Sequence, residues 1–153
     1  MVLPVCAKHE PTRITADMSI SLQQIALGPN AVAEALTLAE AIADPARPGT
    51  SARLAVIVEE LVINLVEHAE PAPGSMISLG MEPVADGIRV VLIDDAAPFD
   101  PRAAPHLGET PNEERGGGSG LAIVRAWSRI LTYSRIDGRN RLELIVHVDP
   151  EDM

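Results

Sequence analysis

The stretch from Ser51 to Ala69, SARLAVIVEELVINLVEHA, constrains the fold more than any other part of the chain. Its apolar residues cover most of the circumference of a helix and leave only a narrow polar stripe. Such a helix needs neighbours on most of its sides, so we expect it to pack against a sheet. Thr50 or Ser51 can cap its start, and the PAPG sequence at 71–74 ends it.

The other elements follow from periodicity and from turn residues. An Ala- and Leu-rich segment without Gly or Pro predicts a helix that Asn30 can cap, and Asp137-Gly138 predicts a hairpin turn. Alternating or continuous apolar runs indicate the strands. We predict strands at 17–25, 76–81, 88–93, 131–136 and 140–148, and helices at 31–43, 50–69 and from the Gly cluster to Ile130.

This order, β-α-α-β-β-loop-α-β-β, predicts an α+β fold: a two-layer sandwich of a mixed, mostly antiparallel sheet with helices on one face. We find no repeat and no linker, so residues 1–153 are expected to form one domain. Within it, we expect residues 1–16 to be a leader. Residues 96–118 carry four prolines and a Gly triplet without periodicity, which is typical of a functional lid or of disorder.

Composition excludes several classes of function. Twelve Lys and Arg against 22 Asp and Glu give a net charge of −10, which opposes binding to nucleic acid. The single Cys6 permits no intrachain disulfide, and no apolar run approaches the length of a membrane span, so we expect a cytoplasmic protein. The segment 115–141 is locally basic, with six Arg and one Asp. This segment can bind a small anion or an acidic protein surface, or it can simply be a solvated surface.

Three features carry candidate chemistry. On the long helix, Glu60, Asn64 and His68 recur every four residues and form one slanted stripe. A carboxylate and a carboxamide one turn apart supply a proton acceptor and a hard oxygen ligand, the pair that activates a hydroxyl beside a Mg²⁺-bound phosphate. The alternative is the solvated face of an amphipathic helix.

The second feature is LIDDAAPFDP, where Asp94 and Asp95 leave a buried strand and enter a proline-rich turn. A carboxylate at a strand end can accept a hydrogen bond from an exocyclic amine, although Asp and Pro also simply end strands. The third is RGGGSGLAIV, a Gly-rich turn into a helix, which either binds an anion or serves as a hinge. It lacks the Lys-Ser/Thr of a Walker loop, and no cysteine–histidine spacing for structural zinc exists.

In this order, the three features resemble the ATP-binding domain of the gyrase, histidine-kinase and MutL superfamily, the Bergerat fold. More narrowly, EELVINLVEHA, DDAAPFDP and GGGSGLAIVRAWSRILTYSRIDGRNRL are similar to the stand-alone bacterial anti-sigma-factor serine kinases. The similarity spans roughly residues 50–148.

The resemblance implies ATP and Mg²⁺ as cofactors and a role for each motif. Glu60 matches the general base, Asn64 the Mg²⁺ ligand and Asp94 the acceptor for the adenine amino group. His68 matches a histidine frequent in the small kinases, and we assign it no catalytic role. The nucleotide-binding set is completed by the residue two after Asp94 and by the second glycine box: Ala96, Gly117, Gly118, Ser119, Gly120 and Leu121.

The resemblance further implies a protein-serine kinase that phosphorylates an anti-anti-sigma antagonist and sequesters a sigma factor, and family members commonly form homodimers. The alternatives are a nucleotide-binding switch without kinase activity and an interaction module that needs no ATP. One residue departs from the family pattern. Ala96 stands where D-x-G has its glycine, and an alanine is strained there if the backbone requires a positive φ.

Overall fold

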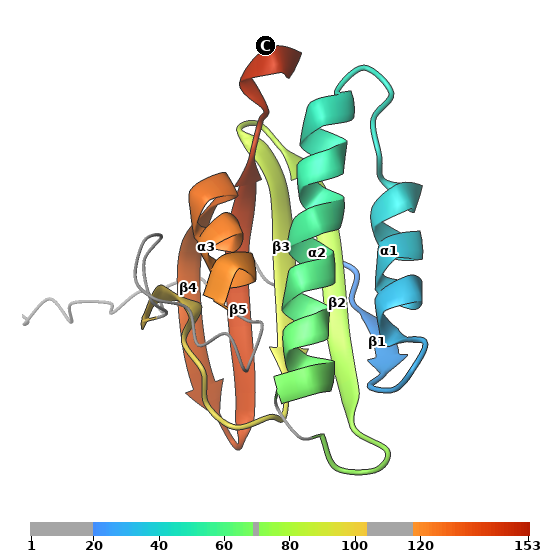
Figure 1. Cartoon of the computed structure of the whole chain (residues 1–153), viewed down its shortest axis with the longest axis vertical. Helices are drawn as coiled ribbons and strands as arrows, with labels where there is room; N and C mark the ends of the chain where they lie inside the picture. Colours follow the sequence, from blue (N-terminus) through green and yellow to red (C-terminus); the bar gives the residue numbers. More distant parts are fainter. Residues whose placement is uncertain (1–19, 69–70, 104–117) are drawn as a thin grey trace, which may run out of the picture.

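The computed structural model describes residues 20–68, 71–103 and 118–153 (Figure 1). The predicted order of elements is confirmed in this part of the chain. In sequence the elements are β1 (Gln23–Ala26), α1 (Ala31–Ala41), α2 (Pro48–His68), β2 (Met76–Val84), β3 (Gly87–Asp94), the short 3₁₀ helix η1 (Pro101–Ala103), α3 (Gly118–Trp127), β4 (Ser128–Ile136), β5 (Arg139–His147) and the 3₁₀ helix η2 (Pro150–Asp152).

In the described residues the sheet has five strands in the order β1-β2-β3-β5-β4, and all four pairings of these strands are antiparallel. The central strand β3 is the apolar run of the sequence, and Val90 and Val91, on opposite faces, are both fully buried. The predicted hairpin joins β4 to β5, with Asp137 (φ 52°) and Gly138 (φ 75°) both in the left-handed region of a tight turn.

Helices α1, α2 and α3 form the second layer, on one face of the sheet, as predicted (Figure 1). α2 lies between α1 and α3 and covers the middle of the sheet. This central place explains its wide apolar surface. Its buried residues include Leu54, Ile57, Val58, Leu61 and Val62, which join the inward-facing side chains of β2, β3 and β5 in one core.

The third helix is shorter than predicted. It ends at Trp127, and the next three residues, expected to be helical, begin strand β4. Ser128 and Ile130 pair with Val146 and Leu144 of β5, and the Ser128 hydroxyl donates to the carbonyl of Val124 at 2.5 Å. Pairing with β5 therefore overrides the helical pattern of LAIVRAWSRI.

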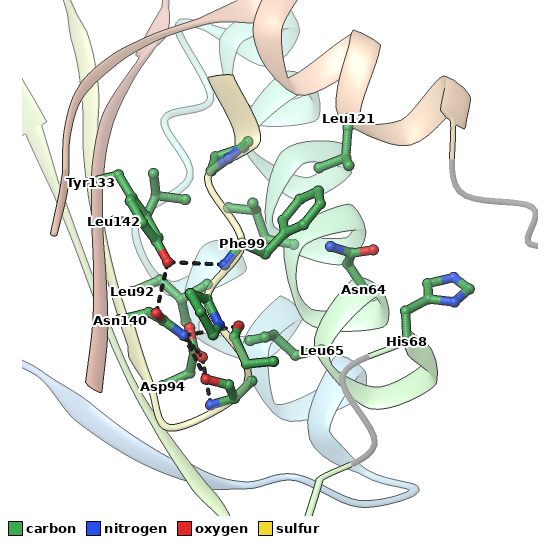
Figure 2. Close-up of a pocket in the computed structure, with 15 residues that line it drawn as sticks. Asn64, Leu65, His68, Leu92, Asp94, Phe99, Leu121, Tyr133, Asn140 and Leu142 are labelled. Carbon is green, nitrogen blue, oxygen red and sulfur yellow. Dashed lines mark hydrogen bonds between the residues drawn. The ribbon is translucent and has the colours of Figure 1, made fainter. Parts of the chain in front are cut away.

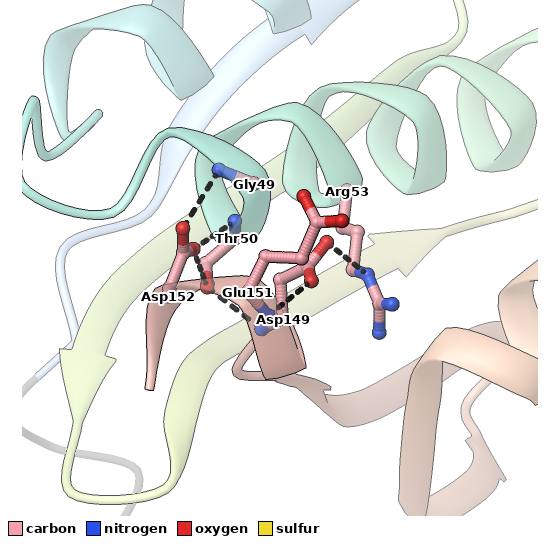
Figure 3. A network of polar contacts seen from close by, with 6 residues as sticks. All are labelled: Gly49, Thr50, Arg53, Asp149, Glu151 and Asp152. Carbon is pink, nitrogen blue, oxygen red and sulfur yellow. Dashed lines mark hydrogen bonds and ion pairs between the residues drawn. The ribbon is translucent and has the colours of Figure 1, made fainter.

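The first turn of α2 also differs from the prediction, because the helix begins at Pro48 and neither Thr50 nor Ser51 is its N-cap. The cap comes from the C-terminal segment (Figure 3). The Asp152 carboxylate accepts hydrogen bonds from the backbone N–H groups of Gly49 (3.2 Å) and Thr50 (2.5 Å) and from the Thr50 hydroxyl (2.6 Å). These bonds lower the pKa of Asp152, with that from the Thr50 hydroxyl contributing most.

The other predicted boundaries differ by a few residues. α1 begins at Ala31 as expected and ends at Ala41, but the Asn30 side chain makes no capping hydrogen bond. β1 covers Gln23–Ala26, whereas residues 17–19 of the predicted first strand lie outside the described residues.

Helices α2 and α3 run antiparallel, and their mutual register is marked at two points. The Arg53 guanidinium lies over the Trp127 ring, 5.1 Å from its centroid, and also donates to Asp149 at 3.1 Å. Seven residues further along α2 and seven residues earlier in α3, Glu60 lies against Gly120. The two contacts are separated by the same distance on both helices, about two turns, as expected for two helices that pack side by side in opposite directions.

The sheet face opposite the helices carries a buried ion cluster. Arg89, only 6% exposed, donates to Glu143 of β5 at 2.6 Å and to Glu82 of β2 at 2.8 Å, and Arg141 donates to Glu143 at 3.0 Å. Burial by itself raises the pKa of Glu143, but the hydrogen bonds from the two arginines outweigh it and lower that pKa below its usual range.

Candidate functional site

A pocket of about 250 Å³ opens between α2, the segment that follows β3, the start of α3 and the last two strands (Figure 2). Its walls are mainly apolar, with Leu61 and Leu65 of α2, Leu92 of β3 and Leu142 of β5. Of the nucleotide-binding residues proposed from sequence, the structure brings together four here: Asn64, Asp94, Ala96 and Leu121. A slot with apolar walls and few polar groups suits a flat heterocycle.

Asp94 is the last residue of β3 and is 8% exposed. Its Oδ1 accepts hydrogen bonds from the backbone N–H of Ala96 at 3.0 Å and from the Asn140 amide at 2.8 Å. Its Oδ2 has no hydrogen-bond partner within the described ranges. The carboxylate is thus fixed by one oxygen, and the other is available to accept a hydrogen bond from a ligand in the pocket.

Ala96 is accommodated without backbone strain. Asp137 is the one non-glycine residue with positive φ in the described part of the chain, so Ala96 lies outside the left-handed region. Its carbonyl accepts from Asn140 at 2.9 Å and from Arg135 at 2.8 Å. The backbone at this position therefore does not require the glycine of the family pattern.

Asn140 and Tyr133 are the site residues that sequence reasoning missed. Asn140 is 3% exposed and donates to Asp94 and Ala96, while its Oδ1 accepts from the Tyr133 hydroxyl at 2.7 Å and from Arg135 at 2.9 Å. The Tyr133 hydroxyl also accepts from the backbone N–H of Phe99 at 2.9 Å. Figure 2 shows this network joining the end of β3 to the last hairpin. It holds the pocket's polar end in one conformation.

Two of the three residues of the polar stripe on α2 line the pocket, and the third, Glu60, does not. Asn64 and His68 line the pocket, and the Asn64 carboxamide has no hydrogen-bond partner among the residues described. The His68 ring lies 3.8 Å from Glu67. Glu60 does not line the pocket and instead contacts Gly120 of α3.

The glycine box is described in part. Gly117 lies outside the described residues, whereas Gly118, Ser119 and Gly120 form the first turn of α3, followed by Leu121 in the pocket wall. The backbone N–H groups of a first turn have no partner within their helix and attract anions. The pocket thus lies next to a helix start that suits an anion.

The chemistry of the donor set is compatible with a magnesium ion. Within the described ranges no three His, Cys, Asp or Glu side chains cluster as a metal site would require. Mg²⁺, however, is usually held by one or two protein oxygens together with the phosphates of its substrate. The unpartnered Asn64 carboxamide at the pocket supplies such an oxygen.

Comparison with known proteins agrees with the fold and with this pocket. The chain belongs to the histidine kinase-like ATPase domain family, whose model matches residues 21–146. It is also similar to the serine/threonine-protein kinase BtrW of Bordetella bronchiseptica, with 32% identity over 101 residues that cover 64% of this chain and 71% of that protein. In the part of the chain described here, no helix has the length and apolar character needed to cross a membrane.

Proposed function

We propose that the protein is an ATP- and Mg²⁺-dependent protein-serine kinase of the anti-sigma type. Its substrate is an antagonist domain of the anti-anti-sigma class. The kinase binds and sequesters a sigma factor when that antagonist is phosphorylated, and it acts in the cytoplasm. One observation supports this most directly. The half-satisfied Asp94 carboxylate faces an apolar slot that ends at the start of α3, in a chain similar to a serine/threonine-protein kinase.

ATP binding in this proposal uses three parts of the pocket. The Oδ2 of Asp94 accepts a hydrogen bond from the adenine amino group, while Leu65, Leu92 and Leu142 contact the ring. The backbone N–H groups at the start of α3 bind the phosphates. Asn64 would hold the magnesium ion, which when bound would supply positive charge to neutralise the phosphates during transfer.

Phosphoryl transfer in this proposal depends on Glu60. The serine hydroxyl oxygen of the antagonist forms a bond to the γ-phosphorus while the bond from that phosphorus to the bridging oxygen breaks, and ADP leaves. The hydroxyl proton passes to the Glu60 carboxylate. No hydrogen bond joins Glu60 to another residue in the described ranges, so this carboxylate is available as a proton acceptor.

The test combines nucleotide binding with transfer. The protein is incubated with Mg²⁺, ATP labelled at the γ-phosphate and a purified anti-anti-sigma protein, and labelled serine is measured. We expect Glu60→Gln to lower transfer by about 10²–10⁴-fold, the usual contribution of a general base. The thermal shift produced by Mg-ATP should be unchanged in this variant.

Glu59→Gln is the matched control, because it makes the same change one residue earlier on α2 and should transfer at the normal rate. Full transfer by Glu60→Gln would contradict the assignment. A stable complex with the antagonist and no labelled serine in the unsubstituted protein would favour the nucleotide-binding switch instead.

A further inference from the structure

The contact between Glu60 and Gly120 is unusually close. A Cβ built on Gly120 would lie 1.9 Å from the Oε2 of Glu60 and 2.7 Å from its Cδ. Both distances are far below van der Waals contact, so the carboxylate occupies the space that a side chain at this position would fill. Gly120 has a helical backbone with no positive φ, so its conformation alone does not call for glycine.

The position of the Glu60 carboxylate depends on this space. Among the described residues no hydrogen bond or ion pair holds the carboxylate, so its location follows from the shape of the α2–α3 interface. The next residues on the two helices, Leu61 and Leu121, both line the pocket. The carboxylate therefore lies at the border of the nucleotide pocket, and the space left by the missing side chain of Gly120 determines its position there.

We propose that Gly120 is a positioning residue for Glu60, in addition to any contact of its backbone with phosphate. This inference rests on the proposed function, in which Glu60 is the proton acceptor. A methyl group at Gly120 displaces the carboxylate rather than disrupting the fold, because the end of a glutamate side chain moves easily. The variant Gly120→Ala then folds and binds nucleotide but holds its base in the wrong place.

The first experiment measures whether the two positions share the same space, and it requires no activity. Gly120→Ala is introduced into the unsubstituted protein and into Glu60→Ala, and the Tm is measured for all four proteins. With the carboxylate removed, we expect alanine to raise the Tm by on the order of 2–4 °C through its better helix propensity. With Glu60 present, that gain should be reduced or reversed. Equal shifts in the two backgrounds would overturn the proposal.

The second experiment separates positioning from nucleotide binding. Transfer from Mg-ATP to the anti-anti-sigma protein is measured for Gly120→Ala, with Gly28→Ala as control because a Cβ at Gly28 meets nothing within 4 Å. We expect kcat to fall by about 10–100-fold in Gly120→Ala, as a displacement near 1 Å can cause, with KM for ATP unchanged and Gly28→Ala normal.

The outcomes of the second experiment are distinct. An unchanged kcat, or a loss confined to KM, overturns the positioning role. If the unsubstituted protein transfers no phosphate, the proposed function fails. The Tm comparison still shows whether the Glu60 carboxylate occupies the space beside Gly120.

Discussion

Replacing Asn140 with alanine is the most direct test of how the pocket is held together. The substitution removes the amide that donates to Asp94 at 2.8 Å and to the Ala96 carbonyl at 2.9 Å. It also removes the oxygen that accepts from Tyr133 at 2.7 Å and from Arg135 at 2.9 Å. Because Asn140 is 3% exposed, water cannot readily replace these partners.

The expected loss follows from the kind of each bond. A hydrogen bond to a carboxylate contributes about 1.5–3 kcal/mol and a neutral one about 0.5–1.5 kcal/mol. Arg135 is exposed and can turn to solvent, so we count the bond to Asp94 and the neutral bonds to Ala96 and Tyr133. The free energy of unfolding should fall by about 3 kcal/mol, near the lower end of their sum. For a chain of this length the Tm then falls by roughly 6–12 °C.

Thermal unfolding followed by circular dichroism measures this loss. The control is Asn30→Ala, since Asn30 is exposed and its side chain makes no capping hydrogen bond. We expect that control to stay within about 0.5 kcal/mol of the unsubstituted protein. If Asn140→Ala lowers the Tm no more than Asn30→Ala does, the network does not stabilise the pocket and the reasoning is refuted.

Three further predictions concern the adenine site, the contact between Thr50 and the C-terminal segment, and the response to acid. Mg-ATP at about 100 times its Kd should raise the Tm by roughly 5–10 °C, and Asp94→Asn should abolish this rise, so a full rise in that variant contradicts the adenine site. Thr50→Val removes the hydrogen bond that the Thr50 hydroxyl donates to Asp152 and the one that it accepts from the backbone N–H of Asp149, so the Tm should fall by roughly 3–8 °C; an unchanged Tm would show that these two bonds do not stabilise the protein. Because Arg89 and Arg141 lower the pKa of Glu143, its contribution to stability is present above its unfolded pKa, 4.5, and is lost as pH falls through the lower folded value. The free energy of unfolding, measured with urea, should therefore fall less between pH 7 and pH 3.5 in Glu143→Gln than in the unsubstituted protein. An equal fall in the two proteins would contradict this.

Local periodicity predicted which elements form but not where contacts between distant segments move their ends. The helix pattern of LAIVRAWSRI continues past Trp127, yet Ser128–Ile130 pair with β5 because strand partners are available there. Likewise, nothing near Pro48 in the sequence indicates that α2 is capped by Asp152, about a hundred residues later in the chain. Only the three-dimensional structure brings these groups together.

The candidate site follows the same division. Asn64, Asp94 and Leu121 belong to motifs whose residue types suit the chemistry, and the structure places them in one pocket. Asn140 belongs to no such motif. One sequence signal was nevertheless present: in the alternation of β5, Asn140 shares the inward face with Leu142 and Leu144. A lone amide on an otherwise apolar face must find hydrogen-bond partners within the protein.

The stack of Arg53 on Trp127 gives the protein an intrinsic optical probe. Trp127 is the only tryptophan in the sequence, so emission excited at its absorption edge has a single source. The ring lies at the end of α3 opposite to the glycine box, under a guanidinium carried by α2. If nucleotide tilts or slides α3 against α2, the distance between the charge and the ring changes, and the emission changes with it. Ligand titrations can thus follow the motion of this helix pair without an attached dye.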